Sequence, residues 1–178
     1  MGSVGQQTNW YVITGAPSSG KTSIIRELEG RGYRVVHEVA RAYIEEALKK
    51  GRKLDEIKAD ALTFEQHILD RKIDIETSLP KEAVIFLDRA IPDSIAYYKL
   101  EGLDAAECLE KSKTVRYKKV FLFERLVFEK DPVRAEDQAI AAKLEYLLEE
   151  SYRALGYTIL RVPAIPVKTR TDFILKHL

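Results

Sequence analysis

The sequence predicts an α/β protein, a three-layer α/β/α sandwich around a five-stranded parallel sheet. Short segments rich in Val, Ile, Leu and aromatic residues alternate along the chain with longer segments of helical periodicity. The short segments are apolar almost throughout, which is typical of strands buried on both faces of a parallel sheet. Parallel strands require crossover connections, and these place helices on both faces of the sheet.

The order of the elements supports this prediction. The predicted strands span 10–14, 33–39, 83–88, 119–124 and 158–163. The predicted helices span 21–29, 40–50, 54–78, 92–101, 104–112, 136–155 and 168–177. Ligands of such sheets bind at the carboxyl ends of the strands, so the residues that follow each strand are the candidate site residues.

Length and composition indicate an ordinary globular protein. The chain has 178 residues, 46% of them hydrophobic and 32% charged, and we expect residues 1–178 to form one domain. The formal net charge of +1 provides no overall field for nucleic acid or an anionic membrane. The single Cys108 cannot form an internal disulfide, and no signal segment or membrane-spanning run is present. We therefore expect a cytoplasmic protein with no nucleic-acid partner and no membrane insertion.

A phosphate-binding loop is the strongest signal in the chain. The stretch GAPSSGKT, residues 15–22, fills the G-x-x-x-x-G-K-[ST] pattern between a predicted strand and a predicted helix. We expect Lys21 to reach the β- and γ-phosphates and Thr22 to bind Mg²⁺; a chance glycine turn is the alternative. The residues expected to bind nucleotide are Gly15, Ala16, Pro17, Ser18, Ser19, Gly20, Lys21 and Thr22, together with Arg125.

An aspartate and an arginine end the third predicted strand. Asp88 stands where proteins with this loop keep the carboxylate that orients Mg²⁺, and a turn residue at the strand end is the alternative. Arg89 cannot activate water, because its guanidinium stays protonated. Its planar fork can instead hold a phosphate or carboxylate. This favours transfer of a phosphoryl group to an acceptor over transfer to water.

These motifs resemble a known family. The segment LDRAIPDSIAYYKLEG, residues 87–102, looks like the DR-x-x-x-S-x-A-Y segment of thymidylate kinases, and nearly the whole chain resembles the NadR-type kinase-like P-loop NTPase domain. The matching positions are GAPSSGKT, Glu38 and Arg41, Asp88, Arg89 and Asp93, and Asp131 and Arg134. The resemblance implies a nucleotide-kinase-like fold. The family includes ribosylnicotinamide and nucleoside kinases and also trafficking proteins that bind GTP and lipid, so it does not decide the function.

The candidate acceptor-binding residues are Glu38, Arg41, Arg89 and Asp93. Glu38 can take the proton of an acceptor hydroxyl or orient it, or it is a helix-start carboxylate favoured by the helix dipole. Arg41 can pair with Glu38 or bind the acceptor. Asp93 is either a helix cap or a contact to a substrate hydroxyl. Tyr97 either walls the acceptor pocket or belongs to the core.

A polar connection at about 125–136 is predicted to form a short mobile lid. Arg125 and Arg134 can each move onto the phosphates and neutralise charge in the transition state, or they are solvated loop charges. The candidate catalytic residues are therefore Lys21, Asp88, Arg89, Glu38 and Arg134.

Together these features predict a phosphotransferase that uses ATP and Mg²⁺. It would move the γ-phosphoryl group to a small-molecule acceptor such as a nucleoside, a nucleotide or a ribosylnicotinamide-like metabolite, with Thr22 and Asp88 at the metal. The alternative is a slowly hydrolysing module that binds ATP or GTP and recruits a partner in one nucleotide state. The acceptor, the choice between ATP and GTP and the oligomeric state are not readable from the sequence.

Overall fold

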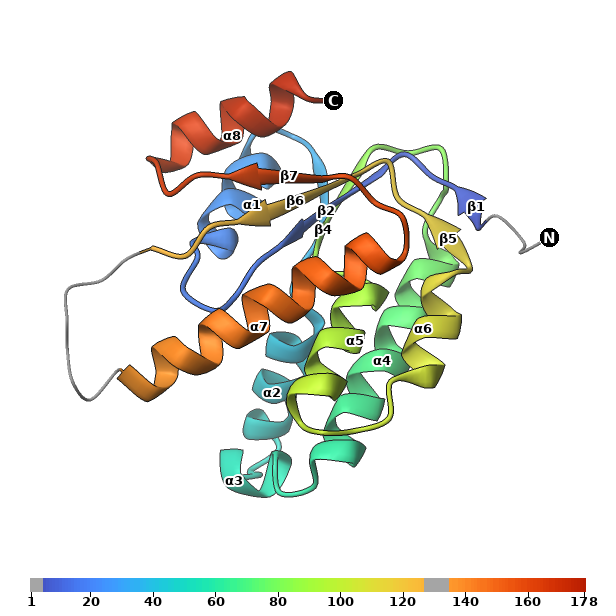
Figure 1. The fold of residues 1–178 in the computed structure, drawn as a ribbon, viewed down its shortest axis with the longest axis vertical. Helices are drawn as coiled ribbons and strands as arrows, with labels where there is room; N and C mark the ends of the chain where they lie inside the picture. The colour runs from blue at the N-terminus through green and yellow to red at the C-terminus, as the bar shows by residue number, and fades with distance from the viewer. Residues whose placement is uncertain (1–4, 127–134) are drawn as a thin grey trace.

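A parallel sheet of five strands occupies the centre of the molecule (Figure 1). The computed structural model describes residues 5–126 and 135–178. The strands of the sheet are β2 (Trp10–Thr14), β3 (Arg34–Val36), β4 (Ile85–Asp88), β6 (Lys119–Phe123) and β7 (Ile159–Val162). Their order is β3-β4-β2-β6-β7, and every neighbouring pair is parallel. The predicted fold class is confirmed.

Helices cover both faces of this sheet (Figure 1). They are α1 (Lys21–Gly30), α2 (Val39–Lys49), α3 (Leu54–Ile57), α4 (Ala61–Ser78), α5 (Ile91–Leu100), α6 (Ala106–Ser112), α7 (Ala135–Ala154) and α8 (Val167–Lys176). Helices α1 and α8 pack on one face, and α5 and α7 lie on the other with α4 and α6 beside α5. Within the described ranges, no helix combines the length and the apolarity needed to cross a membrane.

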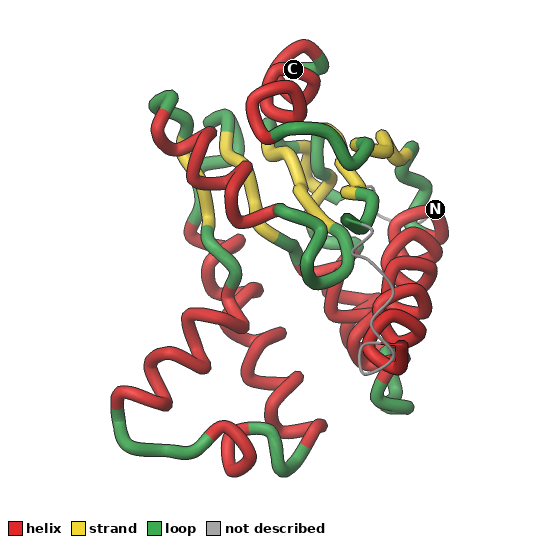
Figure 2. Tube along the Cα trace, turned by 90° about the vertical axis from the view of Figure 1, so that its left-hand side faces the viewer, coloured by secondary structure: helices red, strands yellow, loops and turns green. Residues whose placement is uncertain are grey.

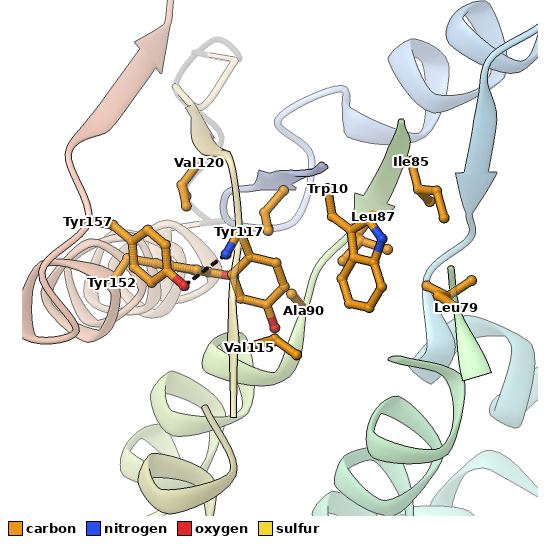
Figure 3. Packing of buried hydrophobic residues seen from close by; sticks show 11 residues of the cluster. Trp10, Leu79, Ile85, Leu87, Ala90, Val115, Tyr117, Val120, Tyr152 and Tyr157 are labelled. Atoms are coloured by element: carbon orange, nitrogen blue, oxygen red, sulfur yellow. Dashed lines mark hydrogen bonds between the residues drawn. The ribbon is translucent and has the colours of Figure 1, made fainter. Parts of the chain in front are cut away.

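Strand β2 shows why the sequences of the strands are apolar at almost every position. All of its residues are buried. Tyr11 and Ile13 pack with residues of α1 and α8, whereas Trp10 and Val12 belong to the cluster on the other face. Figure 3 shows this second cluster, in which the Tyr117 N–H donates to the Tyr157 hydroxyl at 3.2 Å. Side chains alternate between the faces of a strand, so burial of both faces requires an apolar residue at every position.

The structure differs from the sequence predictions in three elements. The predicted helix 54–78 is two helices, because Asp60 interrupts it and caps α4 by accepting a hydrogen bond from the Thr63 N–H at 3.2 Å. The predicted strand 33–39 is shorter, since α2 already begins at Val39. A second, two-stranded sheet of β1 (Gln6–Gln7) and β5 (Val115–Arg116) was not predicted, because strands this short carry no periodic pattern.

Helices α2, α3 and α4 form a helical arm, residues 39–78, that projects beyond the sheet (Figure 2). The Tyr43 ring of α2 stacks on His67 of α4, with ring centroids 5.5 Å apart. Glu46 of α2 pairs with Arg71 of α4 at 2.8 Å. These contacts hold the two long helices of the arm together.

Candidate functional site

Residues 15–20 form the P-loop between the end of β2 and the start of α1. Gly15 adopts φ 145°, and a Cβ there would lie 2.8 Å from the Phe123 carbonyl oxygen. Helix α1 begins at Lys21 with no side-chain cap and no acidic residue in its first turn. Its first N–H groups and the positive end of its dipole therefore favour an anion.

Lys21 lies across this loop. Its side chain is buried, and Nζ donates to the Ala16 carbonyl at 2.9 Å and to Ser19 Oγ at 3.1 Å. Burial, reinforced by the nearby charge of Arg89, lowers the pKa of Lys21 to about 7. A bound anion would favour the protonated ammonium, because an opposite charge stabilises the charged form.

Asp88 ends β4 beside the P-loop strand, in register with Ile13 of β2. The carboxylate is buried, and Oδ1 has no hydrogen-bond partner in the part of the chain that the structure describes. Burial, followed by the charge of Glu38, raises the pKa of Asp88 to about 6. A buried carboxylate oxygen without a donor is costly, and such hard oxygens suit Mg²⁺ or its bound water. Thr22, whose hydroxyl is also an oxygen ligand, lines the neighbouring pocket.

Arg89 has a backbone conformation that is uncommon outside glycine. Its φ is 68°, and its N–H donates to the Ile13 carbonyl at 3.0 Å. The buried guanidinium pairs with Asp93 at 3.3 Å and stacks on Tyr97, 5.2 Å from the ring centroid. Its Nε lies 3.4 Å from Glu38 Oε1, which makes an ion pair, but the orientation does not make a hydrogen bond. The guanidinium of Arg89 is thus held between two carboxylates, those of Glu38 and Asp93.

Asp93 lies behind Arg89 and is completely buried. One carboxylate oxygen accepts hydrogen bonds from the Ala90 N–H at 2.9 Å and from the Tyr152 hydroxyl. The other accepts from the Thr14 hydroxyl and from Arg89. The predicted substrate contact of Asp93 is therefore corrected, since its oxygens are engaged inside the core. The alternative interpretation holds, because the bond from Ala90 caps the start of α5.

Glu38 precedes α2 and faces Arg89. Its side chain is 25% exposed and makes no cap bond to α2. Among the described ion pairs, Glu38 is joined to Arg89 and not to Arg41, so the local pair that the sequence offered is not formed. Arg41 is exposed and lines the same pocket, where a role in acceptor binding stays a prediction.

A pocket of about 910 Å³ joins the P-loop to the helical arm. Lys21, Thr22, Glu38 and Arg89 line it near the loop. Farther along, it is bordered by Tyr97, by apolar side chains of the arm, among them Ile44, Phe64 and Ile68, and by Leu100 of α5. Apolar walls with a few convergent polar groups are typical of small-molecule sites, and the volume is of that order.

Two charged residues of α4, which the sequence analysis missed, also line this pocket. Glu65 is buried, and no hydrogen bond to its carboxylate is found in the described part of the chain; burial raises its pKa. Lys72 is buried and donates to Ser94 Oγ at 3.0 Å, and burial lowers its pKa. Both share the buried stripe of α4 with Ile68 and Leu69. The sequence did carry a signal for these two site residues, because both are charged residues within an otherwise apolar helical stripe.

Arg125 borders a second pocket of about 840 Å³, which Pro17 and Ser18 of the P-loop also line. Its Nε pairs with Glu145 Oε2 at 3.0 Å, and Nη1 donates to the Gln138 carbonyl at 3.2 Å. Arg134 and Asp131 lie outside the described residues, as does most of the predicted lid.

The sheet order, the P-loop and the helices define the class of protein as a P-loop protein with a kinase-like fold. The chain belongs to the family described as AAA domain, AAA_28, whose model matches residues 10–170. The resemblance found in the sequence is thereby confirmed.

Solved structures similar to this chain include nucleoside and nucleotide kinases and NadR. Deoxyadenosine kinase from M. mycoides, with the products dCMP and a flexible dCDP bound, has a TM-score of 0.66 at 18% identity, covering 94% of this chain and 97% of that chain. Thymidylate kinase from Ehrlichia chaffeensis has a TM-score of 0.67 at 13% identity, covering 97% and 98%. NadR in complex with NR has a TM-score of 0.66 at 17% identity, covering 87% of this chain but 43% of NadR. At these identities the likeness shows the fold alone. No curated protein sequence matches significantly.

Proposed function

We propose that the protein is a phosphotransferase that moves the γ-phosphoryl group of ATP, with Mg²⁺, to a small-molecule acceptor. The observation that carries this proposal is the continuity of one pocket. The P-loop residues Lys21 and Thr22 border its one end, Glu38 and Arg89 lie beside them, and an acceptor-sized space extends between the helical arm and α5. The kinase-like fold supports the same reading.

The P-loop end would bind the polyphosphate. The first N–H groups of α1 and the Lys21 ammonium supply positive charge where the β- and γ-phosphates of such nucleotides lie. Phosphoryl transfer needs little covalent help from the protein, so positioning and neutralisation of charge provide most of the rate enhancement.

Glu38 and Arg89 would act on the acceptor. The acceptor hydroxyl oxygen attacks the γ-phosphorus, the bond from phosphorus to the β–γ bridging oxygen breaks, and ADP leaves. Glu38 takes the proton of the attacking hydroxyl. Arg89, held by Asp93, can offer its fork to the transferred group or to a phosphate on the acceptor. This division of roles follows from their positions beside the P-loop in one pocket.

Thr22 and Asp88 would hold the metal ion, Asp88 directly or through water. The observation that supports this assignment is the buried Oδ1 of Asp88, which has no hydrogen-bond partner among the described residues. Mg²⁺ supplies neutralisation of the charge that develops on the β- and γ-oxygens.

The acceptor that fits best is a nucleoside, a nucleotide or a ribosylnicotinamide-like metabolite. The proteins of like fold include one solved with dCMP and dCDP and one solved with NR. In this chain the buried carboxylate of Glu65 offers hydrogen-bond acceptors to which no described residue donates, in a pocket whose neighbouring walls are apolar. A flat ring with N–H or O–H donors matches these two features.

The test is transfer of label from γ-labelled ATP, with Mg²⁺, to pools of nucleosides, nucleoside monophosphates and nicotinamide riboside. Labelled acceptor is expected with the wild type and with Lys168→Ala, a variant of an exposed lysine, but not with Lys21→Ala. A second series with labelled GTP defines the nucleotide preference. Tight nucleotide binding with only traces of free phosphate, and no labelled acceptor, would contradict the proposal and indicate the nucleotide-dependent binding module instead.

A further inference from the structure

Arg170, in the first turn of α8, is buried against the P-loop. Its side chain is 2% exposed. Nη1 donates to the Ser19 carbonyl at 2.6 Å, and Nε donates to the Pro163 carbonyl at 2.9 Å. The guanidinium also lies over the Phe123 ring, 5.3 Å from its centroid. One side chain from the end of the chain thus ties the β7–α8 connection to the nucleotide loop.

The buried guanidinium of Arg170 forms no ion pair within the described residues. Its Nη2 has no hydrogen-bond partner among them. Burial lowers the pKa of Arg170, and the charge of Glu124 opposes that effect. A guanidinium nevertheless remains protonated at neutral pH. A buried, unpaired cation costs free energy unless an anion comes near it.

The loop that Arg170 contacts is the one expected to receive an anion. Ser19 accepts hydrogen bonds from two basic side chains: its carbonyl accepts from Arg170, and its hydroxyl accepts from Lys21. Gly20 permits this approach, because a Cβ there would lie 2.9 Å from Arg170 Nη1. The Ser19 carbonyl and the Gly20 N–H belong to one peptide group. A charged donor on the carbonyl polarises that group and makes its N–H a stronger donor.

We propose that Arg170 is a positioning residue for the nucleotide, and that the polyphosphate held by the P-loop is the counter-charge of its buried guanidinium. Arg170 acts through the Ser19–Gly20 peptide group and through its field, which is poorly screened inside the protein. This inference rests on the nucleotide binding contained in the proposed function, but it does not require phosphoryl transfer.

Inorganic tripolyphosphate tests this role, because it probes the phosphate site without a base or an acceptor. Its dissociation constant is measured by calorimetry, without Mg²⁺, for the wild type, Arg170→Gln, Arg170→Lys and Lys168→Gln. Lys168 is the matched control, since it is an exposed cation in the same turn of α8. We expect about ten-fold weaker binding for Arg170→Gln, recovery of most of the affinity in Arg170→Lys, and a change of less than about two-fold in Lys168→Gln.

Melting temperatures of the free variants separate positioning from a purely structural role. If Arg170→Gln melts at a lower temperature but binds tripolyphosphate as the wild type does, Arg170 contributes only to the stability of the fold and the inference fails. If Arg170→Gln does not fold, Arg170→Met, which keeps the stem over Phe123, replaces it in the same comparison. A wild type that binds neither tripolyphosphate nor ATP would overturn the proposed function together with this inference. If the wild type binds tripolyphosphate but transfers no label, and Arg170→Gln binds tripolyphosphate more weakly than the wild type does, the inference is supported and the proposed function is not.

Discussion

Arg89 and Asp93 form an ion pair inside the protein, with Nη1 of Arg89 3.3 Å from Oδ1 of Asp93 and both side chains almost or entirely buried. The same carboxylate accepts hydrogen bonds from the hydroxyls of Thr14 in β2 and Tyr152 in α7. The orientation of Arg89 in the pocket is therefore coupled to the packing of the core, because one buried carboxylate serves both.

Asp93→Asn should impair stability and transfer together. The amide group introduced at this position would place its N–H donors against the N–H groups that now donate to the Asp93 carboxylate. Arg89 would also lose one of its two carboxylate partners. Breaking a buried pair of this kind costs about 3–5 kcal/mol in the free energy of unfolding. Urea unfolding followed by circular dichroism measures this loss. The control is Asp74→Asn on the exposed face of α4, which should change stability by less than about 0.5 kcal/mol. Equal stabilities of the two variants would contradict the prediction.

Glu38→Gln should lower kcat and leave nucleotide binding intact. An amide cannot take the proton of the acceptor hydroxyl, and loss of a general base lowers rates about 10²–10⁴-fold. Glu38 is partly exposed, so the fold should tolerate the change. Steady-state kinetics and a nucleotide titration are compared with Glu29→Gln, an exposed glutamate of α1. An unchanged kcat would remove Glu38 from the catalytic residues.

Glu65→Gln should stabilise the free protein and weaken acceptor binding. The wild type buries a carboxylate to which no described residue donates a hydrogen bond, and a neutral amide costs less to bury. We expect a gain of about 1 kcal/mol in the free energy of unfolding and a rise of about ten-fold in the KM of the acceptor, with the KM of ATP unchanged. Thermal melts and two-substrate kinetics check both effects, and Asp74→Asn is again the control on α4. A lower melting temperature for Glu65→Gln would contradict the first part.

Nucleotide binding at mildly basic pH should take up a proton. The pKa of Lys21 in the free protein is lowered to about 7, so at about pH 8 most of this ammonium is deprotonated, and the bound phosphates favour its charged form. Uptake of about one proton is expected at about pH 8, and little at about pH 6, where Lys21 is already charged.

Calorimetry of ADP binding with EDTA, in two buffers of different ionisation enthalpy, counts this proton. EDTA removes divalent metal ions, so no metal binds at Asp88 during the titration. Lys168→Met should behave as the wild type does, since this lysine is exposed. Equal heats in both buffers at about pH 8 would show that Lys21 is protonated before the nucleotide binds.

Glu76 should make stability fall as the pH rises. Burial raises the pKa of Glu76 from its ordinary value of 4.5 to about 7, although Tyr117 and the Ile91 N–H donate to its carboxylate at 2.6 and 3.0 Å. Between these values the folded state binds the proton more tightly than the unfolded state does. Stability is thus lost as the pH rises from 4.5 to about 7, by an amount on the order of 3 kcal/mol, and changes little above that range.

Glu76→Gln isolates this contribution, because its amide cannot ionise. The free energy of unfolding of Glu76→Gln minus that of the wild type should become more positive from about pH 5 to about pH 8. Urea unfolding across this range measures the difference, with the exposed Glu82→Gln as control. Parallel pH profiles for Glu76→Gln and the wild type would show that Glu76 titrates alike in both states.

The sequence predicted the parts of the site that lie on contiguous residues. The P-loop and the pair Asp88 and Arg89 each follow a strand directly, and parallel strands bring their carboxyl ends to one edge of the sheet. Glu38 was found for the same reason, since it follows β3 closely. The sequence did not identify Glu65 as a residue of the pocket. The helical stripe shows that its position is buried, but not which cavity the side chain faces.

The sequence by itself determined the layered α/β fold, the order of its main elements and the P-loop, because periodicity and a contiguous motif are local properties. Only the tertiary structure decided which charges are buried and what they contact. It turned Asp93 from a candidate substrate contact into the support of Arg89, and it placed Arg170 on Ser19 across a separation of 151 residues. Burial and charge pairing depend on side chains distant in the chain, and no local pattern records them.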